Sequence, residues 1–211
     1  MKRLLLIALT LLLTPFSHAA DLQLGRDYTL IEPVLQQSNP GKIEVVEFFS
    51  YGCPHCKDFD PLIKEWAAKA PSDVVFRKVP VTFNRPQWTK LANIYYALET
   101  TGDLAKLDSA VFTAVHVDRI NFASDEQIAA WAASKGANAK KVTDALGAFS
   151  MQSLIRRSDQ DVAAAKVTGV PAIVVAGRYM VRNDGATSLA DLVRLTNDVV
   201  AKARQEMTAK K

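Results

Sequence analysis

The sequence predicts an α/β fold in which a long helical segment interrupts a β-sheet. Three features of the apolar pattern lead to this prediction. Residues 43–79 read as a strand, a helix and a second strand. From about residue 86 the apolar period changes from two to about 3.6, which is the period of a helix. After Pro171 the pattern returns to strands, and an amphipathic helix follows them.

The strand–helix–strand unit begins at residues 43–49, an apolar run that indicates a buried strand. The turn Pro40-Gly41 precedes this run, and the helix after it is expected to reach about Ala70. The second strand is expected over residues 74–79. A unit of this size implies that the two strands are parallel and joined by a right-handed crossover. A short edge strand is expected earlier, over residues 27–31.

The middle of the chain predicts several helices, and two of them have recognisable starts. Ser124-x-x-Gln127 is a capping box, and Asn138 is expected to cap a later helix that includes Phe149 among its apolar residues. The helical pattern then resumes and halts at Thr168-Gly169. This segment is interpreted as a helical insertion and not as an internal repeat.

The last part of the chain predicts two strands and a helix. Residues 172–175 and 179–181 form a plausible hairpin around the tight turn Ala176-Gly177. Ser188-x-x-Asp191 then indicates the start of the final helix.

The first nineteen residues are expected to be a signal peptide and not part of the fold. Lys2 and Arg3 give it a charged start, an apolar core follows over residues 4–13, and Ser17-His18-Ala19 is a cleavage site of the small-x-small type. The apolar core is too short for a membrane anchor, which needs ~20 residues. Cleavage is expected after Ala19, so the mature protein is expected to be exported.

The composition argues against nucleic-acid binding. The chain has 26 Lys and Arg residues against 22 Asp and Glu residues, a formal charge of +4. Removing Lys2 and Arg3 with the leader leaves 24 basic residues and a charge of +2. This charge is spread out and forms no basic tract apart from the Lys210-Lys211 tail. The remaining ~190 residues fit one domain, or one domain with an insertion.

The two cysteines of the chain, Cys53 and Cys56, are spaced C-x-x-C where the buried strand gives way to a helix. A structural disulfide across so short a loop would contribute only ~2 kcal/mol. A tetrahedral zinc site needs four ligands, and only His55 and His116 remain as histidines once the leader is removed. The position and spacing therefore favour redox chemistry, and no metal or cofactor is expected.

Cys53 is expected to be the nucleophile because it lies nearest the helix start. The unpaired N–H groups there and the helix dipole favour a thiolate over a thiol, and Pro54 suits a first helical turn. The dipole supplies ~0.3–2 kcal/mol, at most ~1.5 pKa units, so a larger shift needs other donors such as His55. A favoured thiolate makes the disulfide a stronger oxidant. Cys56, one turn later, is expected to be the resolving thiol.

Other chemically active side chains are less distinctive. Glu47 is a carboxylate inside the apolar strand, and strand alternation leaves both burial and surface exposure open for it. Lys78 lies in the neighbouring strand. His116 is expected to be structural. Three aromatic residues are expected in the core rather than in a binding site: Trp88, Tyr95 and Trp131.

The run EFFSYGCPHC, together with Gly169-Val170-Pro171 before an apolar strand, resembles the DsbA family of periplasmic thiol oxidases. The resemblance extends from about Tyr28 to Val200. It implies a thioredoxin-like fold with an inserted helical domain. After a signal peptide at 1–19, the thioredoxin-like domain would comprise 20–82 and 159–211, and the insertion would comprise 83–158.

The resemblance also implies roles for particular residues. Pro171 would be a cis-proline beside the cysteines, which leaves the backbone of Val170 free to pair with an extended substrate. From the residues alone, Pro171 could equally be an ordinary proline at a strand start. Glu47 and Lys78 match the family's buried acid–lysine pair, which would handle protons beneath the cysteines.

The function expected from these features is a periplasmic thiol:disulfide oxidoreductase that gives its disulfide to unfolded exported proteins with reduced cysteines. The resemblance implies reoxidation by a quinone-linked inner-membrane oxidase of the DsbB type. The protein is expected to be a monomer.

Two classes of alternative remain open at this point. One is a disulfide isomerase or reductase of the same fold. Periplasmic isomerases carry a dimerisation domain before the redox domain, and thioredoxin-type reductants have Gly-Pro where this chain has Pro54-His55. The other alternative is a peptide-binding holdase in which the disulfide plays no part.

Overall fold

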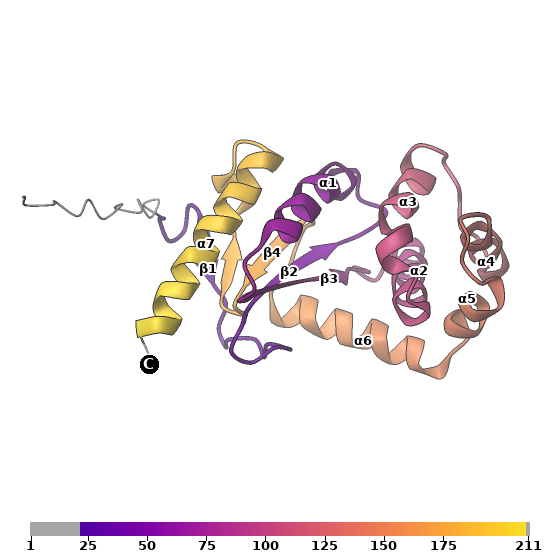
Figure 1. Cartoon of the computed structure of the whole chain (residues 1–211), viewed down its shortest axis with the longest axis horizontal. Helices are drawn as coiled ribbons and strands as arrows, with labels where there is room; N and C mark the ends of the chain where they lie inside the picture. Colours follow the sequence, from indigo (N-terminus) through magenta and orange to yellow (C-terminus); the bar gives the residue numbers. More distant parts are fainter. Residues whose placement is uncertain (1–21, 210–211) are drawn as a thin grey trace, which may run out of the picture.

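The structure is a computed structural model that describes residues 22–209. Within these residues, five strands form one sheet in the order β1-β5-β4-β2-β3 (Figure 1). The strands are β1 (Tyr28–Leu30), β2 (Ile43–Phe49), β3 (Val74–Pro80), β4 (Ala172–Val175) and β5 (Tyr179–Val181). The predicted signal peptide lies outside the described residues.

The sheet is mixed, and its centre is the buried strand β2. β2 pairs in parallel with β3, as the strand–helix–strand pattern predicted. On its other side β2 pairs antiparallel with β4, which forms the predicted hairpin with β5 around Ala176-Gly177. β1 lies at the edge and pairs antiparallel with β5. All seven residues of β2 are buried, because helices cover both faces of the sheet there.

Helices cover the two faces of the sheet and form a separate group at one end of it (Figure 1). Their bounds are α1 (Pro54–Lys69), α2 (Pro86–Thr101), α3 (Leu104–His116), α4 (Asp125–Ser134), α5 (Ala139–Leu146), α6 (Phe149–Ala164), the short helix η1 (Asn183–Gly185) and α7 (Leu189–Ala209). α1 and α7 pack on the face that carries Val45 and Ile173. The end of α6 and the residues after it cover the opposite face, which carries Val46 and Phe48.

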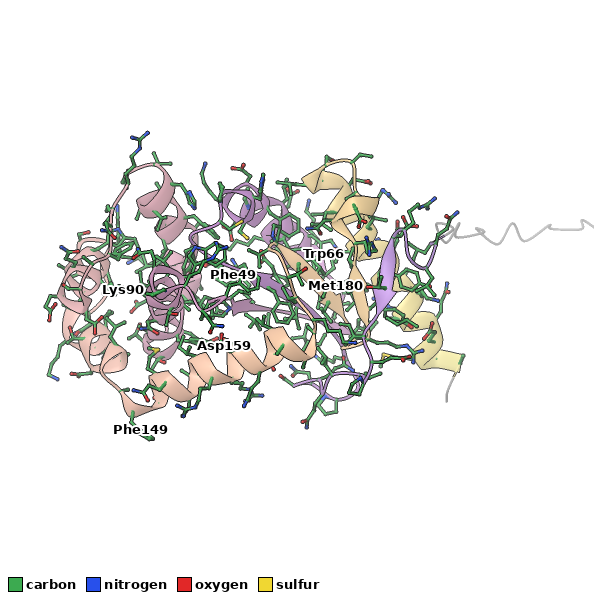
Figure 2. All side chains as sticks on the ribbon, turned by 180° about the vertical axis from the view of Figure 1, so that it is seen from behind. Phe49, Trp66, Lys90, Phe149, Asp159 and Met180 are labelled. Atoms are coloured by element: carbon green, nitrogen blue, oxygen red, sulfur yellow. The ribbon has the colours of Figure 1, made fainter. Side chains whose placement is uncertain are left out.

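The group α2–α5 stands beyond the end of β2, and its core continues into the sheet through Phe49. Figure 2 shows Phe49 between the sheet and the helices. The predicted helix starts are present: the N–H of Gln127 donates to Ser124 Oγ, and the N–H of Lys141 donates to Asn138 Oδ1. No helix between residues 22 and 209 has the length and apolar character needed to cross a bilayer.

The prediction that the helix capped by Asn138 includes Phe149 is wrong. That helix, α5, ends at Leu146, and Phe149 begins α6 with 87% of its surface exposed. Gly147 disfavours continuation of a helix, and Ala148 adopts an extended conformation, φ −67° and ψ 139°, that starts a new one. Figure 2 shows Phe149 projecting from the end of α6.

The division of the chain into a thioredoxin-like part and an insertion over 83–158 remains a proposal. The sheet and the helical group are both present. However, α6 runs as one helix from Phe149 to Ala164, so residue 158 falls inside it. A boundary at that residue cuts a continuous helix that contacts both parts.

The packing of the β4–β5 hairpin can be tested at Gly177 in its turn, with Gly102 at the end of α2 as the control. Both have positive φ, +65° at Gly177 and +79° at Gly102. An added Cβ would lie 2.4 Å from Leu35 O at Gly177 but would meet nothing within 4 Å at Gly102. Gly102→Ala should therefore cost about 1 kcal/mol of unfolding free energy, for the backbone strain alone. Gly177→Ala should cost at least about 1 kcal/mol more, because the clash adds to the strain. Urea unfolding measures both, and equal losses would contradict the packing described.

Candidate functional site

The two cysteines lie where β2 joins α1, at the end of the sheet that faces the helical group. Cys53 is the residue before the first turn of α1, with φ −97° and ψ 118°, and Pro54 occupies the first helical position. The N–H of Cys53 donates to Ser50 O at 3.0 Å, which closes the loop between strand and helix. The sulfur of Cys53 is therefore held beside the free N–H groups of the first turn.

Cys53 and Cys56 are both free thiols, so the structure is that of the dithiol form. Cys53 is 6% exposed and Cys56 is fully buried at 0%, while Pro54 and His55 between them are exposed. Cys53 is thus the more accessible of the two sulfurs, although it is largely buried. A substrate thiol has only Cys53 to reach.

The surroundings of Cys53 favour its thiolate and lower its pKa to about 6. The largest cause is the hydrogen bond that the Cys56 thiol donates to the Cys53 sulfur. Partial burial opposes the shift, whereas the backbone N–H groups of Cys56 and His55 and the charge of His55 support it. Burial, followed by that same hydrogen bond, raises the pKa of Cys56 far above its usual range. The pair therefore carries one thiolate and one thiol at neutral pH.

Val170-Pro171 precedes β4, the strand that pairs with β2, and lies beside the cysteines. The peptide bond between these residues is cis. In its thiol form Cys53 donates through Sγ to Val170 O at 3.4 Å. Asn183 Nδ2 donates to Pro171 O at 2.8 Å and holds this loop against η1. The loop also lines a cavity of about 390 Å³ that extends to Arg182.

Glu47 and Lys78 are paired and buried beneath the cysteines. They stand opposite each other in the β2–β3 register, and their side chains are 0% and 7% exposed. Glu47 Oε2 lies 3.8 Å from Lys78 Nζ, and neither carboxylate oxygen has a hydrogen-bond partner. Burial raises the pKa of Glu47 to about 7, although the Lys78 charge opposes the shift. Glu47 can therefore gain or lose a proton near neutral pH.

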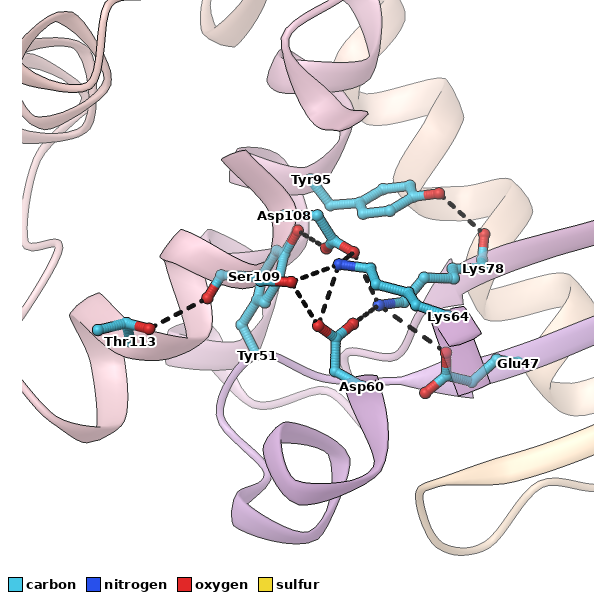
Figure 3. A network of polar contacts seen from close by, with 9 residues as sticks. All are labelled: Glu47, Tyr51, Asp60, Lys64, Lys78, Tyr95, Asp108, Ser109 and Thr113. Carbon is cyan, nitrogen blue, oxygen red and sulfur yellow. Dashed lines mark hydrogen bonds and ion pairs between the residues drawn. The ribbon is translucent and has the colours of Figure 1, made fainter. Parts of the chain in front are cut away.

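Four further polar residues, which the sequence analysis did not single out, extend this buried pair into a network that reaches the surface at Lys64 and Ser109 (Figure 3). They are Asp60 and Lys64 on α1 and Asp108 and Ser109 on α3. Lys78 Nζ lies 2.9 Å from Asp60 Oδ1 and 3.0 Å from Asp108 Oδ2.

Lys64 Nζ lies 3.0 Å from Asp60 Oδ2 and 2.7 Å from Asp108 Oδ2. Ser109 Oγ donates to Asp60 Oδ2 at 2.7 Å. The network thus joins β3, α1 and α3 through side chains.

The charges of this network explain why Glu47 is the carboxyl group whose pKa is raised to about 7. The two lysines are matched by two hydrogen-bonded aspartates, Asp60 and Asp108. Burial opposes the ionised form of Asp108, yet Lys78 and Lys64 hold the pKa of that carboxyl below its usual value. Glu47 is the third carboxylate in a cluster that holds two cations, and it accepts no hydrogen bond.

The side chains expected to be structural divide into two groups. Tyr95 and Trp131 are buried in the core of the helical group. Trp88 is half-buried against the same core, and both Trp88 and His116 contact the loop before Cys53. A Cβ on Gly52 would lie 2.7 Å from Trp88 Nε1, and His116 Nε2 lies 2.8 Å from Tyr51 O. Between residues 22 and 209, no group of three or more His, Cys, Asp or Glu residues is arranged to hold a metal ion.

Comparisons with known proteins agree with this geometry. Residues 44–195 match the model of the DSBA-like thioredoxin domain. The chain is 39% identical over 178 residues to a thiol:disulfide interchange protein DsbA of Bordetella parapertussis, covering 84% of each chain. It is 33% identical over 207 residues to that of Pseudomonas aeruginosa, covering 97% of this chain and 98% of the relative.

The crystal structure of Pseudomonas aeruginosa DsbA superposes with a TM-score of 0.84 at 34% identity, over 90% of this chain and 98% of that one. The fold is therefore thioredoxin-like with a helical insertion, as the sequence predicted. This chain belongs to the DsbA family, and it is a disulfide-bond-forming thiol:disulfide oxidoreductase whose redox pair is Cys53–Cys56.

Proposed function

We propose that this protein is a periplasmic oxidant that transfers its Cys53–Cys56 disulfide to exported proteins with reduced cysteines. The observation that carries the proposal is the contrast between the two sulfurs. Cys53 is the accessible one, and its thiolate is stabilised at the start of α1. Cys56 is fully buried. An oxidant needs this contrast, because stabilising the reduced thiolate weakens the disulfide.

The exchange proceeds in two steps that pass two electrons from the substrate to the protein. A substrate thiolate attacks Cys53 Sγ, a mixed disulfide forms, and the Cys53–Cys56 bond breaks with its electron pair on Cys56. A second substrate thiolate then attacks the substrate sulfur of the mixed disulfide. Cys53 leaves as a thiolate, and the substrate departs with its disulfide. A thiol with a pKa of about 6 is a good leaving group, which favours release.

Glu47 is proposed to exchange a proton with Cys56. Cys56 leaves the disulfide as a thiolate in a buried site that disfavours its charge, so it must take up a proton. The Glu47 charge itself raises the pKa of Cys56, which places the two groups within electrostatic reach. With its pKa of about 7, Glu47 can donate this proton and accept it again on reoxidation. Lys78 keeps the ionised form of Glu47 accessible.

Substrate recognition is assigned to the loop at Val170-Pro171. This loop lies against the nucleophile, with Val170 O 3.4 Å from the Cys53 sulfur. An extended substrate can pair with the Val170 backbone while its cysteine meets Cys53, in the manner of an added strand. Such pairing uses main-chain atoms and suits unfolded substrates of varied sequence.

The setting of the reaction is proposed from the sequence and the family together. The leader pattern at residues 1–19 supports export to the periplasm, and the oxidant role requires a partner that restores the disulfide. A quinone-linked membrane oxidase of the DsbB type fits this requirement. We propose that the protein acts as a monomer and needs no bound cofactor.

The lowered pKa of Cys53 should make the stability of the reduced protein depend on pH. The thiol pKa is about 6 in the folded protein against an ordinary value of 9.0. A depressed pKa stabilises the folded state fully above about pH 9, and this contribution is lost as the pH falls through about 6. The raised pKa of Cys56 changes the stability only above pH 9.0, the ordinary pKa of a thiol. It therefore does not affect the range between about pH 6 and pH 9.

The stability of the reduced protein relative to the oxidised protein should therefore fall as the pH drops from about 9 to about 6. Urea unfolding of both forms measures this difference. The oxidised form is the control, since it lacks both thiols and keeps the other titrating groups. A difference that does not change with pH would contradict the thiolate assignment.

Cys56→Ala should trap substrates as mixed disulfides. The variant loses the Cys56 hydrogen bond, but Cys53 keeps its place beside the N–H groups at the start of α1 and can attack a disulfide of a substrate or of the membrane oxidant. It lacks the internal thiol that would release the resulting mixed disulfide. In cells it should carry exported cysteine proteins, and its membrane oxidant, as bands that disappear on reduction. Cys53→Ala is the matched control and should carry none. Equal trapping by the two variants, or the reverse pattern, would show that nucleophile and resolving thiol are wrongly assigned.

A further inference from the structure

The loop of residues 50–53 carries Cys53 on backbone that belongs to neither β2 nor α1. Two hydrogen bonds tie down its N–H groups. The N–H of Cys53 donates to Ser50 O at 3.0 Å, and the N–H of Gly52 donates to Ser50 Oγ at 3.1 Å. Gly52 has no Cβ, so the backbone next to the nucleophile is intrinsically permissive. These two bonds leave the carbonyl group of Tyr51 without a partner from the loop itself.

The carbonyl group of Tyr51 is held by α3. His116, the last residue of α3, places Nε2 2.8 Å from Tyr51 O. A carbonyl oxygen only accepts hydrogen bonds, so Nε2 must carry the proton and donate it. The Tyr51–Gly52 peptide is planar, and it is now fixed at both ends, by His116 at its C=O and by Ser50 at its N–H. The orientation of this plane sets the direction in which the chain enters Cys53.

Both partners in this hydrogen bond are themselves held in place. The His116 ring stacks on Phe112, with ring centres 6.4 Å apart and an angle of 25° between the planes. The Tyr51 ring packs edge-on against Phe112 at 4.9 Å, and its hydroxyl donates to Asp108 Oδ1 at 2.5 Å (Figure 3). Residues of α3 therefore contact Tyr51 at three points, which are the carbonyl oxygen, the ring and the hydroxyl group of Tyr51.

We propose that His116 is a positioning residue for thiol–disulfide exchange, which acts through the Tyr51–Gly52 peptide to hold the Cys53 sulfur over the first turn of α1. The inference rests on the proposed role of Cys53 as nucleophile and leaving group. The N–H groups of His55 and Cys56 stabilise the thiolate only at short distance and good angle. Without the His116 hydrogen bond, the Tyr51–Gly52 peptide plane is held at its N–H alone and can tilt, and the sulfur loses part of this stabilisation.

The test compares His116→Asn with His116→Gln in the purified, reduced protein. Both substitutes are polar amides, but only glutamine is long enough for its Nε2 to reach the position of the histidine Nε2. Thr113→Ala is the control on the same helix, since Thr113 is exposed and bonds only to the backbone of α3. The ultraviolet absorbance of the thiolate, followed against pH, gives the pKa of Cys53. A second measurement is the rate at which each oxidised variant oxidises a peptide dithiol.

His116→Asn should raise the Cys53 pKa by roughly half to one unit and slow the oxidation severalfold, since a hydrogen bond of ~1 kcal/mol corresponds to a factor of about five. His116→Gln and Thr113→Ala should keep both values close to those of the unaltered protein. If the asparagine and glutamine variants had the same Cys53 pKa as the unaltered protein and differed only in melting temperature, His116 would be merely structural and the inference would be overturned.

Two further outcomes keep the inference separable from folding defects and from the proposed function. Nitrogen NMR of His116 in the unaltered protein should show a proton on Nε2 throughout the titration of Cys53, and a ring protonated on Nδ1 alone would overturn the inference without any variant. If the unaltered protein showed no lowered pKa at all, the proposed role of Cys53 would fail, and this inference with it. If the Cys53 pKa is lowered in the unaltered protein and His116→Asn does not change it, the role of His116 is overturned and the proposed role of Cys53 stands.

Discussion

The stabilisation of the Cys53 sulfur at the start of α1 is the interaction on which the rest of the site depends. A buried strand delivers the chain to this point, and Pro54 begins the helix at once, so that the unpaired N–H groups of the first turn meet the sulfur. The helix dipole alone supplies at most ~1.5 pKa units. The lowering of the Cys53 pKa to about 6 therefore needs the hydrogen bond from Cys56, which is available only because Cys56 is buried and stays protonated. The contrast between the two cysteines and the oxidising character of the pair have the same origin.

Beneath this pair, the buried charges join the sheet to the helical group. Burying three carboxylates and a lysine is costly unless each is matched, and removing one partner of such a pair costs about 3–5 kcal/mol. Asp60 and Asp108 satisfy Lys78 with hydrogen bonds of 2.9 and 3.0 Å, and Glu47 is left with an ion pair at 3.8 Å and no hydrogen bond. Asp108 belongs to α3, which also holds Tyr51, so the same helix contacts both the buried charges around Glu47 and the loop that carries Cys53. The helical group is in this sense in direct contact with the surroundings of the redox pair.

Much of the fold could be predicted from the sequence, because apolar periodicity reports directly which face of an element is buried. The parallel strands, the hairpin and the helix starts at Ser124 and Asn138 all follow from such local patterns. The C-x-x-C pair at a strand-to-helix junction was similarly visible. The contacts of Asp60, Asp108 and His116 were not, since these residues meet partners on other elements, up to 65 positions away in the chain. Periodicity indicates that a helix face is buried, but not which polar side chains on neighbouring elements will meet there. An acidic residue at a core-facing helical position, such as Asp60 between Phe59 and Ile63, is the signal that could have revealed the network.

The measurement that tests the central claim most directly is the redox equilibrium of Cys53–Cys56 with glutathione as a function of pH. Below a pH of about 6, both cysteines of the reduced protein are protonated, and the equilibrium constant should not depend on pH. Above it, the reduced protein holds one proton fewer, while glutathione still releases two on oxidation until its own thiol ionises near pH 8.5. Mass action then requires the constant for forming the reduced protein to rise about tenfold per pH unit between about 6 and 8.5. A constant that stayed flat across this range would show that Cys53 is an ordinary thiol, and a stabilised Cys53 thiolate could not then be the source of the oxidising character.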